Sequence, residues 1–359
     1  MWNSFNANIN KIVSKVTIRN FKIIEDEEFT FKNLTILTGE NGSGKTSLIQ
    51  SILLAGNQYH NSIRMYLDSL GIRELFNYNY NNDVYVTIEP NSGNCVSYKI
   101  NKASMSFTID NNTNLNINFL TYPDNLVYLN AFRQGLFAYS NFNQSYNVRE
   151  FGIFGEMAVN YYEHNKRNLI EDYLVEDNES YTLEQQLNYW LSYITNNNVN
   201  FYSEKINFSQ IQNGFIISGN FHLPQNTGTG FSYLFSILVS CLSAKRGNII
   251  IIENPEIHLH PKSQAKLGEF FAFIASKGIQ LIIETHNDHI INKICYEIYK
   301  NSISKDDVII HYFSIPYKKT TIYIDSKGHF INEQGEPTQF PEGFFDATLK
   351  EVFEMNEDI

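Results

Sequence analysis

The sequence predicts an α/β fold in which helices flank a central, largely parallel sheet. A glycine-rich turn at 39–47 lies between a short apolar strand and an apolar helix. Two largely apolar runs, 248–252 and 279–283, are typical of strands buried on both faces of a sheet, and each is followed by polar residues. Alternating polar and apolar residues at 84–119 indicate a second, antiparallel sheet of half-buried strands.

The composition is that of a large, acidic globular protein. The chain has 359 residues, 43% of them hydrophobic, and a net charge of −11, so it can bury a sizeable core. The negative charge argues against a nucleic-acid surface over the whole molecule but leaves room for a local basic groove. The three cysteines are far apart and show no C-x-x-C spacing, which favours a reducing cytoplasm. We see no signal peptide and no apolar run of about 18 residues, so we expect no membrane span.

The first part of the chain is expected to form two strands and then the strand before the glycine-rich turn. Apolar residues between Ile12 and Phe31 are spaced as in two strands, and we expect the acidic run Glu25–Glu28 to be the hairpin turn between them. The short strand at 34–37 then leads into the turn. Further along, turn-like clusters separate four alternating segments that predict the antiparallel sheet, at 84–88, 95–100, 106–109 and 115–119.

The remaining elements alternate between strands and helices. A short strand at 126–129 precedes a helical region at 150–200, where apolar residues at helical spacing indicate packing rather than a cofactor site: Leu183, Leu187, Trp190, Leu191 and Ile194. A strand at 213–221 and an apolar helix ending near Ala244 lead to the two buried strands, which a helix at about 263–276 connects. Polar residues gather where these strands end, and ligands bind there in open α/β sheets.

The glycine-rich turn carries the strongest functional signal. Residues 39–46 match G-x-x-x-x-G-K-[ST] in full, in the required strand–turn–helix context. Glycines allow successive backbone N–H groups to surround a polyphosphate, and the helix N-terminus adds donors and partial positive charge. We expect Lys45 to reach the β- and γ-phosphates and the Thr46 hydroxyl to bind Mg²⁺. The sequence therefore predicts a nucleoside triphosphate site.

A carboxylate is expected opposite this loop. Glu253 directly follows the run of four isoleucines, which is the Walker B arrangement downstream of a phosphate loop. We expect Glu253 to hold Mg²⁺ directly or through water, with Thr46 on the other side. The start of the apolar helix, Thr227–Gly230, is a second possible anion site, although glycine-rich helix starts are common.

Four histidines near the strand ends allow two interpretations. They could be zinc ligands, but the spacing H-E-x-x-H is absent: His258, His260, His286 and His289. The preferred interpretation is that His286 alone, at the end of a strand, touches a γ-phosphate or orients water.

Taken together, these motifs resemble the SMC-like ABC ATPases, a group that includes RecF, the Rad-type repair ATPases and the OLD-family nucleases. The resemblance covers 12–58 and roughly 205–325 well and the middle poorly. The closing stretch Phe340–Asp346 is similar to the C-terminal motif of a prokaryotic subgroup, whose members resemble the PtuA component of the Septu antiphage system and ATPases found with retrons. The motifs that carry the resemblance are Asn20–Lys22, the phosphate loop, 226–232, 253–261 and 285–288.

The resemblance implies a domain organisation. Residues 1–58 and 205–325 would form an ABC-type ATPase head, and 59–135 an antiparallel β lobe of that head. A helical insertion would occupy 136–204, and a C-terminal extension 326–359.

The resemblance also implies residue roles in a head-to-tail dimer with two composite ATP sites. In one subunit, Asn20 and Lys22 would approach the nucleotide, while the loop would hold phosphates and Mg²⁺ through Gly39, Asn41, Gly42, Ser43, Gly44, Lys45, Thr46 and Ser47. The signature of the other subunit would close on the γ-phosphate through Thr227, Gly228, Gly230 and Ser232. His286 matches the switch histidine. Either Gln58 or Gln134 would be the glutamine that senses Mg²⁺, and the sequence does not decide between them.

Departures from the family pattern shape the expected function. Asn254 stands where typical ABC ATPases carry the water-activating Glu, and an amide can position water but cannot accept its proton. Unless Glu256 substitutes, we expect slow hydrolysis. Coiled-coil arms and a Toprim domain are missing, so nuclease or toxin activity is expected in a separate partner protein.

The leading hypothesis is a dimerising ATPase of an antiphage system that regulates such an effector. The alternatives are an ATP-locked scaffold with negligible hydrolysis and a RecF-like DNA-repair ATPase. No basic stripe in the sequence supports direct nucleic-acid binding.

Overall fold

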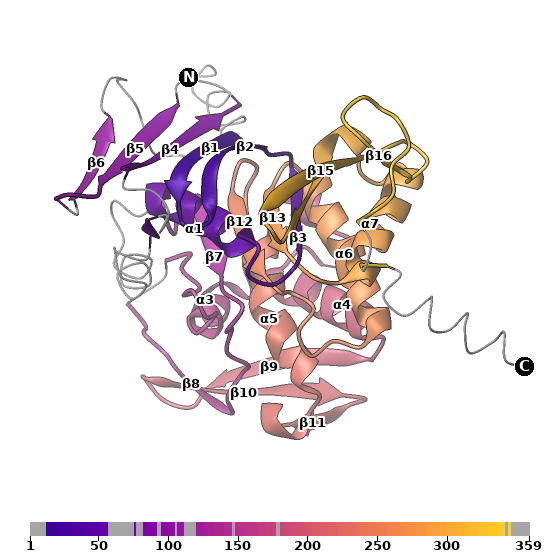
Figure 1. Ribbon diagram of the computed structural model, residues 1–359. Coiled ribbons are helices and arrows are strands. Elements are labelled where there is room, and N and C mark those ends of the chain that lie inside the picture. Colours follow the sequence, from indigo (N-terminus) through magenta and orange to yellow (C-terminus); the bar gives the residue numbers. More distant parts are fainter. Residues whose placement is uncertain are drawn as a thin grey trace, which may run out of the picture.

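A mixed seven-stranded sheet forms the centre of the molecule (Figure 1). The computed structural model describes residues 12–56, 75–76, 82–91, 95–104, 106–110, 120–145, 148–176, 180–341 and 344–345. The central sheet consists of β3 (Leu34–Gly39), β7 (Leu126–Leu129), β12 (Ile249–Glu253), β13 (Gln280–Glu284), β14 (Val308–Ser314), β15 (Lys318–Ile324) and β16 (Phe330–Ile331). Its order is β16-β15-β14-β3-β13-β12-β7, with parallel pairing from β14 to β7 and antiparallel pairing at β15 and β16.

Two antiparallel sheets lie at opposite ends of the view in Figure 1. One has the order β2-β1-β4-β5-β6. Its strands are β1 (Val13–Phe21), β2 (Ile24–Thr30), β4 (Val84–Pro90), β5 (Val96–Asn101) and β6 (Ser106–Asp110). The other joins β10 to β8, β9 and β11, which are β8 (Tyr139–Asn141), β9 (Val199–Lys205), β10 (Gln210–Ile217) and β11 (Asn220–His222).

Helices cover both faces of the central sheet. They are α1 (Lys45–Gly56), α3 (Ala158–Asn165), α4 (Leu183–Thr195), α5 (Thr229–Leu242), α6 (Pro261–Ser276) and α7 (Asp288–Tyr299). Single turns of 3-10 helix occur at Asp172–Leu174, Pro224–Asn226 and Lys305–Asp307. Among the helices of the described ranges, none is both long and apolar enough to cross a membrane.

The isoleucines of β12 show why its sequence lacks alternation. Ile249 and Ile251 belong to the core shared with α1 and the β1–β2–β4–β5 sheet. Ile250 and Ile252 point the other way, into the core formed with helices α3 to α7. All four are fully buried, because both faces of a parallel strand are covered. The predicted α/β class with a central sheet between helical layers is confirmed.

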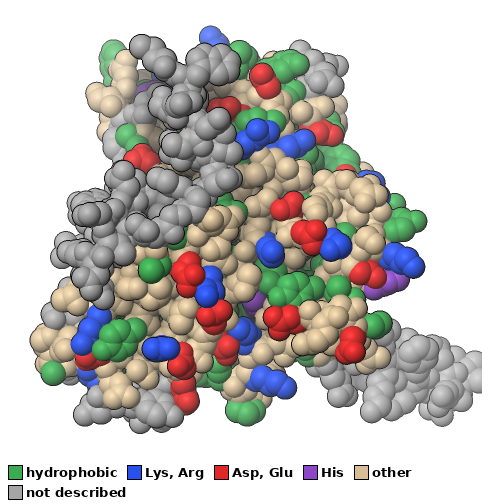
Figure 2. Space-filling model, turned by 90° about the horizontal axis from the view of Figure 1, so that it is seen from above, with side chains coloured by type: hydrophobic (Ala, Val, Ile, Leu, Met, Phe, Trp, Pro, Cys, Tyr) green, Lys and Arg blue, Asp and Glu red, His purple; other side chains and the backbone are tan. Residues whose placement is uncertain are grey.

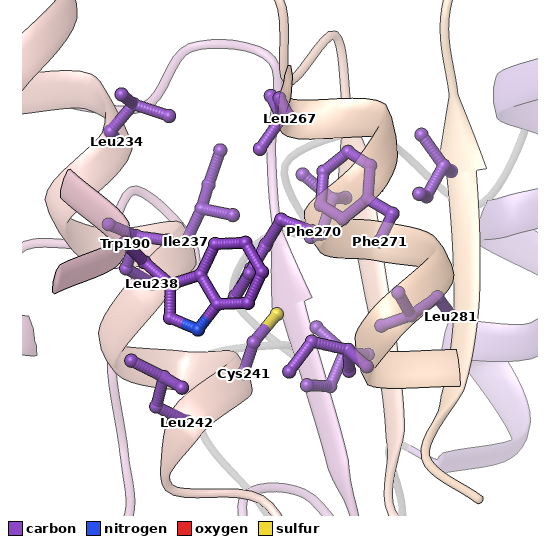
Figure 3. Packing of buried hydrophobic residues seen from close by; sticks show 14 of the residues in the cluster. Trp190, Leu234, Ile237, Leu238, Cys241, Leu242, Leu267, Phe270, Phe271 and Leu281 are labelled. Carbon is purple, nitrogen blue, oxygen red and sulfur yellow. The ribbon is translucent and has the colours of Figure 1, made fainter. Parts of the chain in front are cut away.

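The larger core joins α4, α5 and α6 (Figure 3). In that view Trp190 points toward Cys241 and Leu238, and its ring lies 4.9 Å from the ring of Phe270. The apolar stripe of 183–194 thus serves packing, as the sequence indicated.

The acidic run Glu25–Glu28 is not a hairpin turn. It lies inside β2, and the turn falls between Phe21 and Ile24, which are register partners. Basic neighbours explain how a strand carries these charges, because Lys319 forms a 2.9 Å ion pair with Glu27. Within the sheet itself, Arg19 on β1 forms a 3.1 Å ion pair with Asp26, its register partner. The prediction treated charge as a turn signal, whereas these ion pairs compensate it.

Several other expectations change because strands pair with distant partners. The strand expected at 213–221 is two strands, β10 and β11, with a turn at Ser218 and Gly219. The segment expected to be a helical insertion contains α3 and α4 but also β8 and β9, which pair with β10. Strand β7 lies beside β12 in the central sheet rather than in the antiparallel lobe. The strand predicted at 115–119 lies outside the described residues.

Candidate functional site

The phosphate loop runs from the end of β3 to the start of α1. Gly39 has φ +124°, and a Cβ there would lie 2.0 Å from the carbonyl oxygen of Phe313 on β14, so only glycine fits. Gly44 has φ +107°, and its Cβ would lie 2.9 Å from the side chain of Ile23. By contrast, nothing lies within 4 Å of a Cβ placed on Gly42. The loop is therefore packed at both ends and open in the middle, where a ligand can approach.

Lys45 is folded onto its own loop. Its ammonium group donates hydrogen bonds to the carbonyl oxygens of Gly39 (3.1 Å) and Glu40 (2.6 Å). The Ser43 hydroxyl also donates to the Glu40 carbonyl, at 2.7 Å. Burial lowers the pKa of Lys45, although the charges of Glu284 and Glu40 act in the opposite direction. Phosphate oxygens would have to replace the loop carbonyls as acceptors for Lys45.

The other expected loop residues take different positions. Asn41 is exposed at the open part of the loop, while Ser47 is buried on α1. The Asn20 amide donates to the backbone carbonyl of Asp83 at 3.0 Å, so it is directed toward the antiparallel sheet. Lys22 donates to the side-chain oxygen of Gln50 on α1, which ties the β1–β2 turn to the helix that begins at the phosphate loop.

Two glutamates end neighbouring strands of the central sheet. Glu253 on β12 and Glu284 on β13 are direct register partners. The Glu253 carboxylate accepts hydrogen bonds from the Tyr128 hydroxyl (2.9 Å) and the Ala131 N–H (3.2 Å). The Thr46 hydroxyl instead lies 3.3 and 3.4 Å from the two carboxylate oxygens of Glu284. The structure thus places Glu284, rather than the expected Glu253, in contact with Thr46.

Glu284 was missed in the sequence, although a signal existed. It ends the second buried, largely apolar strand, just as Glu253 ends the first. Burial raises the pKa of Glu284 to about 7, the negative charge of Glu253 adds to the effect, and Lys45 opposes it. Burial also raises the pKa of Glu253.

These groups fit a magnesium ion. Hard cations prefer carboxylate and hydroxyl oxygens, and Mg²⁺ usually takes only one or two protein ligands beside water and phosphate. Thr46 and Glu284 supply such a pair of oxygens. A divalent cation would also offset the repulsion between the two buried carboxylates.

The residues after β12 and β13 surround this pair. Asn254 adopts a left-handed backbone with φ +43°, and its side-chain oxygen is buried without a hydrogen-bond partner among the described residues. The Glu256 carboxylate accepts the backbone N–H of His286 at 3.1 Å, and burial raises its pKa. Partial burial of the ring and the charge of Lys45 lower the pKa of His286, which favours the neutral imidazole. An unpartnered acceptor at Asn254 is what a site awaiting water or ligand would present.

Arg133 is a site residue that the sequence did not single out. Its guanidinium donates to the carbonyls of Asn130 (2.9 Å), Glu253 and Asn254 (2.8 Å). Only 2% of Arg133 is exposed, and burial lowers its pKa to about 10, so it stays charged at neutral pH. It joins the segment after β7 to the end of β12. No local sequence signal marks it, because its three acceptors are backbone groups.

Of the two candidate magnesium-sensing glutamines, only Gln134 is among the described residues. Gln58 lies outside the described residues. Gln134 is exposed, and its backbone N–H donates to the carbonyl of Phe154 at 2.8 Å.

The signature segment begins α5 without a side-chain cap. Gly228 is the residue before the helix, and nothing lies within 4 Å of a Cβ placed on it. Gly230 is tightly packed, because its Cβ would lie 2.9 Å from the His258 carbonyl oxygen. Ser232 is buried, and Thr227 donates to the Pro224 carbonyl at 2.8 Å. In the described part of the chain, no hydrogen bond, ion pair or ring contact joins 227–232 to 39–47.

The histidines do not form a zinc site. The ring of His258 packs edge-on against Tyr233 at 4.7 Å, and the Nδ1 atom of His260 accepts the Lys262 N–H at the start of α6. Within the described ranges, no group of three or more His, Cys, Asp or Glu side chains is arranged to hold a metal.

Two protein families match parts of this chain. Residues 34–292 match the family described as "AAA domain, putative AbiEii toxin, Type IV TA system". Residues 303–355 match "Protein of unknown function (DUF3696)". No curated protein matches the chain.

Several solved structures share the fold at low sequence identity. An SMC head bound to the C-terminal winged-helix domain of ScpA has a TM-score of 0.57 at 11% identity, covering 87% of this chain and 98% of that one. An SMC head with an extended coiled coil, bound to the C-terminal domain of ScpA from Pyrococcus furiosus, has a TM-score of 0.53 at 10% identity, covering 96% and 99%. The recombination mediator RecF has a TM-score of 0.46 at 10% identity, covering 87% and 99%.

The first family model spans more than half of the chain, and the SMC heads confirm the predicted head fold. The chain belongs to the AAA domain family described as a putative AbiEii toxin of a type IV toxin–antitoxin system, and it has the fold of an SMC head.

Proposed function

We propose that two copies of this chain bind ATP and Mg²⁺ head to tail, hydrolyse ATP slowly, and thereby regulate a separate effector protein in prokaryotic antiphage defence. One observation carries the dimer: α5 begins without a side-chain cap, and Gly228 faces open space. An uncapped helix N-terminus favours an anion, and the γ-phosphate held by a second copy is the anion of suitable chemistry.

Each residue of the site would have a defined task. Lys45 binds the β- and γ-phosphates once it leaves the loop carbonyls, and Thr46 orients Mg²⁺. Mg²⁺, when bound, neutralises charge that develops on the phosphates. His286, kept neutral by its lowered pKa, can hydrogen-bond the γ-phosphate or the attacking water.

Slow turnover is proposed because of Asn254. Its unpartnered side-chain oxygen can accept a hydrogen bond from water and so position it, but the amide cannot take the proton. Glu256 is the candidate base. Its carboxylate lies at the strand ends through its bond to the His286 N–H, and its raised pKa brings it closer to neutrality, where a general base works best.

The effector role has two supports. The family to which the chain belongs is described as a putative toxin of a type IV toxin–antitoxin system. The two SMC heads with TM-scores of 0.57 and 0.53 were each solved in complex with a domain of ScpA, which is a separate protein. We propose a nuclease or toxin as the corresponding partner of this chain, and the cytoplasm as its location.

A mixing experiment tests the composite site. Lys45→Ala removes the phosphate ligand from one half-site, and Gly228→Glu places a carboxylate in open space at the other half-site without a clash inside the subunit. Each variant alone should lose ATP-dependent dimerisation in light scattering and lose phosphate release. Mixing them should restore about half of both, because one of the two sites in a heterodimer is then intact.

Two outcomes would contradict the proposal. Wild-type ATP turnover that the Lys45→Ala variant retains would rule out this loop as the ATPase site. Full activity of the Gly228→Glu variant alone would rule out the signature as half of a composite site.

An ATP-locked scaffold with negligible hydrolysis is the second candidate, and Asn254 favours it. It predicts an ATP-dependent dimer without measurable phosphate release. A RecF-like role receives less support. Figure 2 shows Lys and Arg interspersed with Asp and Glu on the face that it draws, without a continuous basic stripe among the residues coloured by type.

A further inference from the structure

We infer that a groove between α3 and β9 binds a short acidic peptide segment of a partner protein through Arg167 and Lys205. The inference rests on the proposed function for the existence of a partner, but the groove shares no residue with the ATP site. Its volume is about 550 Å³. It is lined by the end of α3, the residues that follow this helix and the end of β9: Glu163, His164, Lys166, Arg167, Tyr202, Ser203, Glu204 and Lys205.

The two carboxylates of the groove are already held by groups of the chain. Glu163 accepts hydrogen bonds from the Ser203 hydroxyl at 2.5 Å and from the Lys166 ammonium group at 2.9 Å, and only 6% of its side chain is exposed. Lys166 also donates to the Ser203 carbonyl oxygen at 2.9 Å, which ties the end of α3 to β9. The Glu204 carboxylate accepts a hydrogen bond from the Tyr202 hydroxyl. These acidic groups therefore build the wall of the groove.

Arg167 and Lys205 have no acidic partner among the described residues. Arg167 is exposed, and within the described ranges its side chain forms no hydrogen bond, ion pair or ring contact. The Lys205 ammonium group lies 4.1 Å from the centre of the Phe142 ring. A cation–π contact positions the ammonium group but leaves its N–H donors for a ligand. The same ring stacks on that of His164 at 4.7 Å, so packing fixes the wall beside Lys205.

The groove has an excess of positive charge on a strongly acidic chain. Its lining contains three cations, Lys166, Arg167 and Lys205, and two carboxylates, whereas the whole chain has a net charge of −11. Because Lys166 is matched by Glu163, the cations left for a ligand are Arg167 and Lys205. A guanidinium binds a carboxylate through two parallel hydrogen bonds, and the ammonium group can pair with a second carboxylate. An acidic segment supplies both.

The size and the mixed charge of the lining favour a peptide over a nucleic acid. Ligand pockets measure about 300–1,000 Å³, so this groove suits a short segment rather than a long strand. A nucleic-acid strand carries regularly spaced phosphates and is bound along a continuous track of cations. Glu204 is exposed in the groove and would repel such a backbone. A peptide can place carboxylates at two positions and neutral groups beside Glu204.

The groove is built on two elements that pack against the signature helix. Figure 1 shows α3 and β9 next to α5. The ring of Tyr162 on α3 lies 5.4 Å from that of Phe235 on α5, and the ring of Phe201 on β9 lies 4.1 Å from the same ring. A segment docked in the groove therefore touches the supports of the helix that begins at the signature. This placement suits a partner whose regulation depends on the proposed dimer.

Peptide binding to the full chain, measured without nucleotide, tests the inference. Fluorescein-labelled hexaglutamate is titrated into the protein at low and at high salt, and binding is followed by fluorescence anisotropy. We expect binding that salt weakens, and no binding of labelled hexalysine. Arg167→Glu and Lys205→Glu should each weaken hexaglutamate binding at least about tenfold, because each turns an attraction into a repulsion.

Lys327→Glu is the matched control. It makes the same change of charge at an exposed site between β15 and β16, so it should weaken binding less than about twofold. Thermal unfolding of the groove variants should match that of the wild type, because both side chains are exposed. Arg167→Gln and Lys205→Gln, which only remove the charge, replace any charge-reversal variant that unfolds early.

Several outcomes would overturn the inference. They include failure of the wild type to bind hexaglutamate, unchanged binding in both groove variants, and equal weakening in Lys327→Glu. Tighter binding of a labelled oligothymidylate, lost in the groove variants, would assign the groove to a nucleic acid instead. Nucleotide-free self-association in light scattering that Arg167→Glu abolishes would assign it to a second copy of the chain.

The Lys45→Ala variant separates the inference from the proposed function. It alters the phosphate loop and leaves the groove intact, so it should bind hexaglutamate as the wild type does. ATP turnover retained by Lys45→Ala would overturn the proposed ATP site, while peptide binding that depends on Arg167 and Lys205 would still support the groove. Conversely, loss of phosphate release in Lys45→Ala without any peptide binding by the wild type would overturn the groove alone.

Discussion

The backbone N–H of Asn254 donates a 2.7 Å hydrogen bond to the carbonyl oxygen of Glu284. This bond joins the residue that follows β12 to the last residue of β13. It helps to hold Asn254 in its left-handed conformation, φ +43°, which asparagine tolerates better than most residues. This hydrogen bond therefore holds the ends of β12 and β13, which carry the candidate site, next to each other.

A carboxylate at position 254 should speed up hydrolysis. Asn254→Glu introduces a group that can accept the proton of the attacking water. We expect faster steady-state phosphate release and a shorter lifetime of the ATP-dependent dimer. Asn254→Gln is the control, because it has the same backbone strain of about 1–3 kcal/mol but no carboxylate. Equal turnover in both variants would mean that Asn254 is not the brake.

Two glycines of the phosphate loop should respond differently to alanine. Gly39→Ala should destabilise the fold strongly, by about 3 kcal/mol or more, because its Cβ would meet the Phe313 carbonyl oxygen at 2.0 Å. Gly42→Ala should fold, since nothing lies within 4 Å of its Cβ, and should lose only about 1–3 kcal/mol through its positive φ. Urea unfolding of the purified proteins measures both. Similar stability of the two variants would contradict this description of the loop.

Removal of the Arg133 guanidinium should destabilise the site without touching the phosphate loop. Arg133→Lys loses the planar fork that serves the carbonyls of Asn130, Glu253 and Asn254, and we expect a loss of about 2–4 kcal/mol in urea unfolding. Arg19→Ala is the matched control. Its ion pair is exposed, so its loss should change stability by less than about 1 kcal/mol. A stable Arg133→Lys variant would show that these backbone contacts are dispensable.

A buried histidine should make stability fall in mild acid. His311 is 1% exposed, and burial lowers its pKa from 6.5 to about 4. The folded state therefore binds fewer protons than the unfolded state between these values. The stability is fully present above pH 6.5 and is lost as the pH falls toward 4, by roughly 3 kcal/mol in total.

Replacing His311 should flatten this pH dependence. The ring nitrogens lie 2.7 Å from the Thr30 carbonyl oxygen and 3.2 Å from the Thr321 hydroxyl, so His311→Gln retains polar groups in place of the ring. Stability measured by denaturant at pH 7, 6, 5 and 4.5 should fall less steeply in this variant. Identical slopes for the wild type and His311→Gln would exclude His311 as the cause.

The prediction of local features succeeded where the signal was contained in neighbouring residues. The phosphate loop and the two buried strands follow from glycine spacing and from apolar runs, and the structure has both. Pairing partners were harder to predict. The acidic run Glu25–Glu28 reads as a turn in isolation, but it is a strand because Lys319 and other basic neighbours compensate its charge.

The sequence by itself determined that this chain has a phosphate loop, a strand end bearing the carboxylate Glu253, and an amide where a catalytic Glu is usual, because each of these is a local pattern. The tertiary structure alone decided that Glu284 meets Thr46, that Arg133 supports the end of β12, and that α5 begins without a side-chain cap. These relationships depend on the lateral order β3-β13-β12 and on the packing of distant segments. Such non-local pairing arises from burial of the whole core, and no short stretch of sequence encodes it.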